Sequence, residues 1–210
     1  MTVARQPPPR TDRGGRADHA RERLLDAAVA AFAERGFHGT TTRDIAAAAG
    51  LSPAAVYVHH RSKEELLWVI SYAGHQRTLA VVDASLAAAG PEAEPSERLG
   101  RVVEDFVRHH ALAHTSARVV NDELGALSPA HREAIGQLRH AITTRLVEVI
   151  AEGERRGAFA CGDVRMTAAA LLSMGIDLAR WYDERGGWGA EEIAAHYRAL
   201  ALRMVGAGPR

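Results

Sequence analysis

The chain has 210 residues, of which 47% are hydrophobic, 25% charged and 5% aromatic, and its formal net charge is zero. This length allows a sizeable buried core, which excludes a stapled mini-protein, and the abundance of alanine among the apolar residues favours an all-α fold. A single cysteine, Cys161, excludes an intramolecular disulfide. We find neither a secretion signal nor an apolar run long enough to cross a bilayer, and we expect a cytoplasmic protein without contact to a membrane.

The charges are distributed unevenly along the chain. Residues 1–63 carry ten Arg and Lys against six Asp and Glu, whereas residues 64–210 carry sixteen against twenty. A basic N-terminal part on an acidic remainder indicates contact with nucleic acid at one end of the chain. Residues 1–17 combine three consecutive prolines with four arginines, so we expect a disordered basic arm. The arm is either an untethered terminus or, as in homeodomains, a segment that follows the DNA.

Three helices are predicted in the part that follows the arm. Residues 18–36 place apolar side chains at steps of three and four, which is typical of a helix packed on one face. Thr41 or Thr42 caps a short second helix, and a third helix spans residues 53–59, where a serine cap precedes a proline. The two short helices are joined by a tight turn that contains Gly50. This arrangement is typical of a helix-turn-helix, in which the second short helix enters the major groove of DNA.

The rest of the chain is also expected to be helical. A long fourth helix begins at a capping box, in which Ser62 and Glu65 each bind the other's backbone amide, and ends near Ala89. Further helices are expected around Val102, Val103, Phe106 and Val107, from Pro129 to the 153–157 segment, over 163–183 and over 190–205. The predicted organisation is a basic arm (1–17), a DNA-binding domain (18–67), and a C-terminal domain for effector binding and dimerisation (68–210).

Several short motifs occur together between Arg21 and Leu67. They are Phe37 after a glycine, paired threonines before Arg43-Asp44-Ile45-Ala46, the Ala49-Gly50 turn, Tyr57, and the Ser62-Lys63-Glu64 helix start. This combination resembles the N-terminal domain of the TetR family of bacterial transcription regulators. The resemblance implies a three-helix DNA-binding domain joined to a helical ligand-binding and dimerisation domain, and a dimer that binds a double-stranded DNA operator.

The resemblance also implies which residues meet DNA. They are Thr42, Arg43, Ser52, Ala54, Ala55, Tyr57, His59 and Lys63. Tyr57 and Lys63 are expected on phosphates, and His60 stands where the family usually has an aromatic ring. A purely structural interpretation stays open for three of them: Thr42 as a helix cap, Tyr57 as the rim of the small core, and Lys63 as a solvated side chain.

Dimerisation is expected through the last two helices, which in the family pair with those of a second subunit as a four-helix bundle. Ile193, Tyr197, Leu200 and Met204 form a stripe suited to such a homodimer. Periodicity does not show whose surface a stripe meets, so burial within the same subunit is the alternative.

The effector is expected to be a small hydrophobic or amphiphilic molecule bound in the helical body. Candidate polar contacts are His109, His110, His114, Arg118, Asn121, Glu123, Arg180, Trp181 and Tyr182. An arginine flanked by aromatic rings, as at Arg180, suits an anionic or planar group. The C-terminal segment is similar to that of TetR-family members that sense acyl-CoA thioesters, so an acyl-CoA and another hydrophobic molecule both stay open.

Other classes of function have weaker support in the sequence. His110 and His114 lie four residues apart on one helix face and could bind the metal ion of a metal sensor. Cys161 could be the reactive thiol of a redox sensor, but the chain has no second cysteine with which it could form a disulfide. A non-regulatory small-molecule-binding protein is a further alternative. We find no nucleophile with its base, no paired carboxylates and no glycine-rich phosphate loop, so we expect neither an enzyme nor a cofactor.

Overall fold

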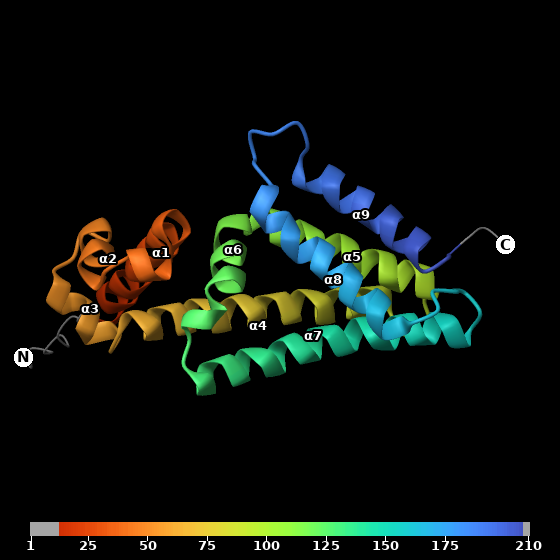
Figure 1. The fold of residues 1–210 in the computed structure, drawn as a ribbon, viewed down its shortest axis with the longest axis horizontal. Coiled ribbons are helices and arrows are strands. Elements are labelled where there is room, and N and C mark those ends of the chain that lie inside the picture. Colours follow the sequence, from red (N-terminus) through yellow and green to blue (C-terminus); the bar gives the residue numbers. More distant parts are fainter. Residues whose placement is uncertain (1–12, 208–210) are drawn as a thin grey trace, which may run out of the picture. The chain divides into compact units, whose positions relative to one another are not determined.

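The structure is a computed structural model that describes residues 13–207 (Figure 1). It confirms the all-α prediction, because these residues form nine α-helices and one 3-10 turn without a strand. The chain divides into two compact units after Leu66. No helix within residues 13–207 combines the length and the apolar character needed to cross a membrane.

Helix α4 begins in the first unit and continues into the second. The elements in chain order are α1 (Arg13–Gly39), α2 (Thr42–Ala48), α3 (Pro53–His59), α4 (Lys63–Ala89), α5 (Pro95–Leu112), α6 (His114–Asp122), a 3-10 turn (Leu124–Ala126), α7 (Pro129–Arg155), α8 (Val164–Trp181) and α9 (Ala190–Met204).

The first helix is longer than the sequence pattern predicts. It begins at Arg13 and not at Asp18, so the last part of the predicted arm is helical, while residues 1–12 lie outside the described residues. Gly36 has a φ of 71° and interrupts the helical backbone, as expected of a glycine that ends a helix.

The predicted caps are present, with one difference. Thr41 caps α2 in a complete capping box with Asp44. Ser52 caps α3 by accepting a hydrogen bond from the Ala55 amide. At α4 the Glu65 amide donates to Ser62 Oγ at 3.0 Å, but the Glu65 carboxylate accepts from the Arg61 amide. The predicted reciprocity between Ser62 and Glu65 is therefore wrong, because the carboxylate binds the amide one residue earlier.

A helix boundary that the sequence pattern does not reveal lies at Ala113. Its φ and ψ of −106° and 20° end α5, and α6 starts at the next residue. The buried face continues across this break, from Ala111 in α5 to Ala117 in α6. As a result His110 and His114 belong to different helices, and the prediction that they share one helix face is wrong.

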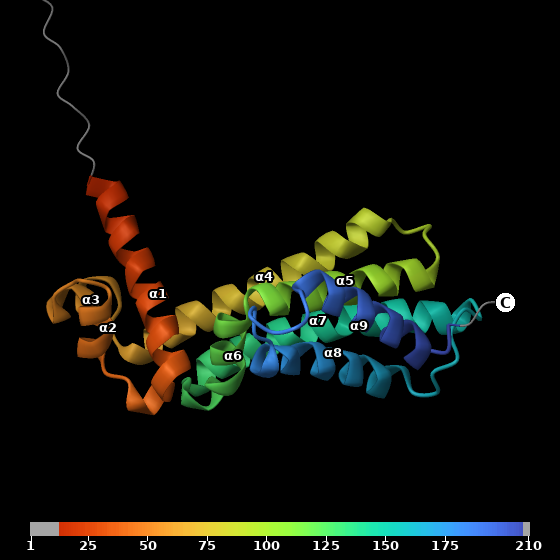
Figure 2. The same cartoon turned by 90° about the horizontal axis from the view of Figure 1, so that it is seen from above.

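The core of the second unit forms around α5, which packs against α7, α8 and α9 (Figures 1 and 2). Two glycines allow the close packing in this unit. A Cβ on Gly175 of α8 would lie 2.7 Å from the Phe106 ring, and one on Gly153 of α7 would lie 2.0 Å from the Phe159 ring. Both rings are buried, so they occupy the space that a larger residue would need.

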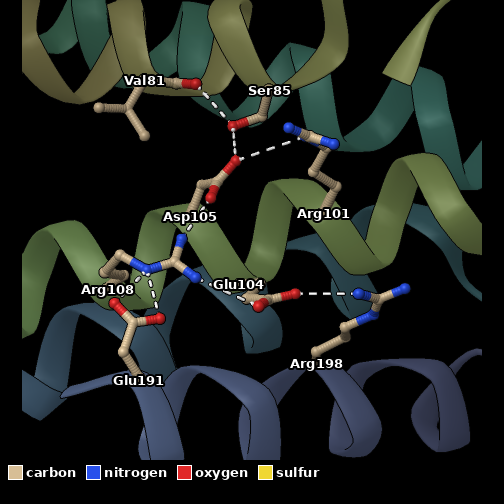
Figure 3. Close-up of polar contacts among 8 residues, drawn as sticks. All are labelled: Val81, Ser85, Arg101, Glu104, Asp105, Arg108, Glu191 and Arg198. Atoms are coloured by element: carbon tan, nitrogen blue, oxygen red, sulfur yellow. Dashed lines mark hydrogen bonds and ion pairs between the residues drawn. The ribbon is translucent and has the colours of Figure 1, made fainter. Parts of the chain in front are cut away.

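Charged groups on α5 connect this helix to α4 and α9 (Figure 3). Arg108 donates from Nε to both carboxylate oxygens of Glu191 on α9, at 2.7 and 2.9 Å, which raises the pKa of the guanidinium. Ser85 of α4 donates to Asp105 at 2.7 Å, and Asp105 also pairs with Arg108. The hydroxyl and the two ion pairs thus hold α4, α5 and α9 in one polar network.

Candidate functional site

The short helix α3 presents an exposed face beside a buried anchor. Val56 is fully buried and holds the helix to the core of the first unit, whereas Ala54, Tyr57 and Val58 are exposed. Tyr57 and Val58 have exposed fractions of 58% and 79%, which is unusual for large apolar side chains. Residues three and four apart share one helix face, so these three side chains form one surface.

The start of α2 lies beside this surface. The hydroxyl groups of Thr42 and Tyr57 are 3.2 Å apart and within hydrogen-bonding distance. Arg43 follows Thr42 and is exposed, as is Ser52 at the start of α3. The structure therefore places Thr42 beside Tyr57 and leaves Arg43, Ser52 and Ala54 exposed, and their contact with DNA stays a prediction. Of the others, Ala55 and His59 are half-buried.

Lys63, the single lysine of the sequence, is held inside the first unit. Its ammonium donates to the carbonyl oxygens of Phe37 and Thr40 at 2.6 and 2.7 Å and lies 4.1 Å from the centre of the Phe37 ring. An ammonium has three N–H donors, so two of them are used by the end of α1 and its connection to α2. Lys63 thus joins α4 to this connection, and its contact with phosphate stays a prediction for the third donor.

The turn between α2 and α3 depends on Gly50. This residue has a φ of 65°, a conformation that residues with a Cβ rarely adopt. The Arg23 guanidinium of α1 donates to the Ala49 carbonyl next to it, and a Cβ on Gly50 would lie 2.7 Å from Arg23 Nη2. The turn is therefore shaped by the glycine and covered by an arginine from α1.

His60 is buried directly after α3. Only 2% of its surface is exposed, and its Nε2 has no hydrogen-bond partner within residues 13–207. Burial lowers the pKa of this imidazole, and the charge of Arg21 lowers it further. A neutral histidine thus fills the position of the aromatic ring that the resemblance implies.

The predicted effector contacts differ in burial and in the partners that they bind. His110 is buried in the second unit, whereas Arg180 is exposed and pairs with Asp122 at 2.7 Å and with Asp177 at 3.6 Å. Since two carboxylates already neutralise Arg180, its predicted role as an anion anchor loses its main physical support. The ring of Tyr182 contacts that of His114 at 5.4 Å, Trp181 is exposed, and Arg118 is half-buried on α6.

Further polar side chains of the second unit are buried or joined to one another. Ser71 and His75 of α4 and His110 of α5 are all buried. Asn121 of α6 accepts a hydrogen bond from Arg139 of α7 at 2.9 Å. Sequence reasoning missed Ser71, His75 and Arg139. The available signal was the four-residue spacing of Ser71 and His75 within an otherwise apolar part of the long fourth helix.

Two of the alternative functions, a metal sensor and a redox sensor, depend on the surroundings of the histidines and of Cys161. The described residues contain no group of three or more His, Cys, Asp or Glu side chains arranged to hold a metal ion. Cys161 is half-buried, and burial together with Glu154 raises the pKa of its thiol. A raised pKa reduces the thiolate fraction, which is the reactive form.

The predicted dimer stripe on α9 is only partly available. Ile193 is buried and Tyr197 half-buried, and both pack in the core of their own unit, so for them the alternative interpretation is correct. Another face of α8 and α9 is exposed, and most of its residues are small: Met166, Ala169, Ala170, Ser173, Ala195 and Ala199.

Comparisons with known proteins match both parts of this architecture. Residues 24–68 match the family described as "Bacterial regulatory proteins, tetR family", and residues 92–205 match "Tetracyclin repressor-like, C-terminal domain". A bacterial regulatory protein of the TetR family from Rhodococcus RHA1 is 39% identical, with a TM-score of 0.85 over 90% of this chain and 98% of that one.

Two further similar proteins have names or descriptions that state what they regulate or bind. The transcriptional repressor KstR2 of Mycobacterium tuberculosis is 29% identical over 90% of this chain and 94% of its own length. Its structure, described as that of a ketosteroid transcriptional regulator, has a TM-score of 0.81. The regulator AibR, solved with isovaleryl coenzyme A and operator DNA, is 23% identical and shares the fold with a TM-score of 0.75, over 90% of this chain and all of that one. With both domains matched and close relatives along nearly the whole length, the chain belongs to the TetR family of bacterial regulatory proteins.

Proposed function

We propose that this TetR-family protein is a homodimeric repressor that leaves an inverted-repeat operator when an amphiphilic effector binds its helical body. The observation that carries the proposal is the exposed face of α3, where Tyr57 and Val58 are exposed although the same helix buries Val56. A surface that exposes apolar side chains in this way is typical of a binding surface.

The chemistry of this face suits the major groove. The small side chain of Ala54 allows the backbone of α3 to approach base edges, and the Val58 side chain offers an apolar contact for a thymine methyl group. The hydroxyl of Tyr57 and the guanidinium of Arg43 are suited to phosphates on either side. Val58 is thus a further residue that we expect to affect base preference.

The dimer is supported by the exposed face of α8 and α9. Small side chains such as Ala169, Ala170 and Ala199 allow two helices to approach closely, which a four-helix bundle requires. A two-fold dimer presents two copies of α3, and it therefore needs an operator with inverted half-sites.

Arg43 and Lys63 are expected to behave differently when they are replaced. Arg43→Ala should reduce the slope of log affinity against log salt by about one, because one phosphate contact is lost, and should leave the unfolding midpoint unchanged. Lys63→Met should instead destabilise the first unit by about 1–3 kcal/mol, because two carbonyl oxygens lose their donor. Salt-dependent operator binding and urea unfolding of both variants separate the two roles. An unchanged stability of Lys63→Met would contradict the structural role.

The effector proposal is supported by the relatives and by α4. AibR, a regulator of this fold, was solved with isovaleryl coenzyme A and operator DNA, so an acyl-CoA thioester is our first candidate. A ketosteroid, for which KstR2 is named, is the second. Helix α4 contributes residues to both units, which makes it the element through which an effector in the second unit can act on the first. An effector shifts DNA affinity only as far as it prefers one of the two conformations.

The test is a titration of acyl-CoA thioesters of increasing chain length against the protein bound to a labelled operator, which is first obtained by selection from random DNA. We expect at least one thioester to raise the unfolding midpoint of the free protein. The same thioester should weaken operator binding, and the operator should weaken binding of the thioester by the same factor. Free coenzyme A is the control for the acyl chain. Operator binding that no thioester weakens would refute the acyl-CoA assignment while leaving the DNA-binding function intact.

A further inference from the structure

We propose that Arg23 of α1 is a positioning residue for operator recognition, which fixes the turn that presents α3 to the base edges and reads no base itself. The inference rests on the proposed function, because it assigns a role in DNA binding to a residue outside the two helices of the helix-turn-helix. Arg23 lies 26 positions before its hydrogen-bond partner Ala49, and the sequence motif gives no sign of this contact.

The end of α2 shows what Arg23 contributes. The two amides that follow Ala49 donate to the carbonyls of Ala47 and Ala46, at 3.0 and 2.9 Å. With Gly50 at a φ of 65°, these two bonds form a Schellman motif, the common way in which a helix ends at a glycine. The motif does not use the Ala49 carbonyl, which accepts a hydrogen bond from the Arg23 guanidinium. Arg23 thus completes the end of α2 from a different helix.

The guanidinium also fills the space beside the turn. A Cβ on Gly50 would lie 2.7 Å from Nη2 and 4.0 Å from Cζ of Arg23, so the cation covers the side of Gly50 on which other residues carry a side chain. Ala49 is only 4% exposed. A buried carbonyl that loses its donor is costly, so we expect the peptide between Ala49 and Gly50 to rotate toward another donor when Arg23 is removed.

The path from this turn to α3 is short. Ser52, the N-cap of α3, follows Ala49 by three residues. Helix α3 has seven residues and buries one side chain, that of Val56, so few contacts besides the turn fix its direction. The hydroxyl groups of Thr42 and Tyr57 provide another contact, but they join α3 to the start of α2 and not to its end. Contacts with base edges depend on exact distances, so a small change in the direction of α3 affects base recognition first.

A direct contact between Arg23 and a DNA phosphate is the competing explanation, because Arg23 is exposed and has further N–H donors. The two roles differ in what they change. A phosphate contact adds to the affinity for every DNA sequence and to its salt dependence. A positioning residue adds to the affinity only where bases are read. Binding to operator and to unrelated DNA therefore separates the two roles.

The experiment measures binding of the full-length protein to its selected operator and to a scrambled duplex of the same length, over a range of salt concentrations. Arg23→Met keeps the length of the side chain but has no donor. It should weaken operator binding about three- to tenfold, the range expected for the loss of one hydrogen bond. Binding to the scrambled duplex, and the slope of log affinity against log salt, should stay those of the parent.

Three further variants complete the test, each checked by urea unfolding. Arg43→Ala is the matched control, because the loss of a phosphate contact should weaken binding to both duplexes and reduce the slope by about one. Arg23→Lys retains a donor, and its operator affinity should lie between those of Arg23→Met and the parent. Gly50→Ala disturbs the same turn from the other side. Combined with Arg23→Met, it should lower operator affinity by much less than the product of the two single losses, because both changes break one contact.

The outcomes separate this proposal from the proposed function. An equal loss on both duplexes with a reduced slope would assign Arg23 to a phosphate, and parent-like operator binding by Arg23→Met would show that the turn keeps its shape without the guanidinium. Either result overturns the positioning role, as would losses that multiply in the double variant. If instead the parent protein binds no selected sequence more tightly than the scrambled duplex, the proposed function itself fails, before any variant is compared.

Discussion

Gly153→Ala is expected to destabilise the protein by about 2–3 kcal/mol, although alanine is the better helix former. The reason is steric: the added methyl group would lie 2.0 Å from Cδ2 of the buried Phe159 ring. The ring follows the end of α7 closely, and the Phe159 amide donates to the carbonyl of Gly153 itself. Neither group can move without breaking this chain reversal.

The matched control is Gly136→Ala on the same helix. Gly136 is exposed, and a Cβ there would meet no atom within 4 Å. This change should stabilise the protein by about 1 kcal/mol, from helix propensity alone. Urea unfolding of both variants gives the two free energies with opposite signs. A Gly153→Ala protein as stable as its parent would mean that the ring has other space to occupy.

Acid is expected to destabilise the second unit strongly, beginning below pH 6.5. Burial lowers the pKa of His110 from 6.5 to about 4 and also lowers the pKa values of His75 and His109. Above pH 6.5 these rings are neutral in both the folded and the unfolded chain, so they cause no loss. Below it the unfolded chain takes up protons that the folded chain does not, and stability falls. His110 alone accounts for about 3 kcal/mol by pH 4, at about 1.4 kcal/mol per pH unit.

The variant His110→Gln removes this titration and keeps a side chain that can donate to the Phe106 carbonyl. Its free energy of unfolding should fall less steeply than that of the parent between pH 6.5 and 4, whatever its value at pH 7.5. His140→Gln, which replaces an exposed histidine of α7, is the control for the loss of a histidine as such. Equal slopes for His110→Gln and the parent would show that His110 is protonated in the folded state.

Local signals predicted the helix starts well. Ser52 and Ser128 each precede a proline, and Asp163 precedes an apolar run; all three cap helices in the structure. Such caps act between neighbouring residues, so sequence spacing is enough to find them. The break at Ala113 has no comparable signal, because neither glycine nor proline is present and the apolar pattern continues through it.

The candidate sites show the same difference between local and distant contacts. Tyr57 and Thr42 could be assigned from their motif, but the hydrogen bond that joins them crosses from one helix to another. Lys63 looked like a solvated or phosphate-binding side chain, since its partners Phe37 and Thr40 lie on a connection far earlier in the chain. Arg139 gave no signal, because its hydrogen-bond partner Asn121 lies on another helix.

The hydroxyl of Ser71, which is buried and has no hydrogen-bond partner within residues 13–207, has a consequence for protein engineering. Selection for thermal stability alone is expected to enrich alanine at this position, because the free protein gains by losing a buried hydroxyl that binds nothing. If the hydroxyl of Ser71 contacts the effector, variants from such a screen would respond poorly to effector while retaining operator binding. A biosensor derived from this regulator would therefore need a selection in which stabilisation and induction are scored together, with position 71 held as serine.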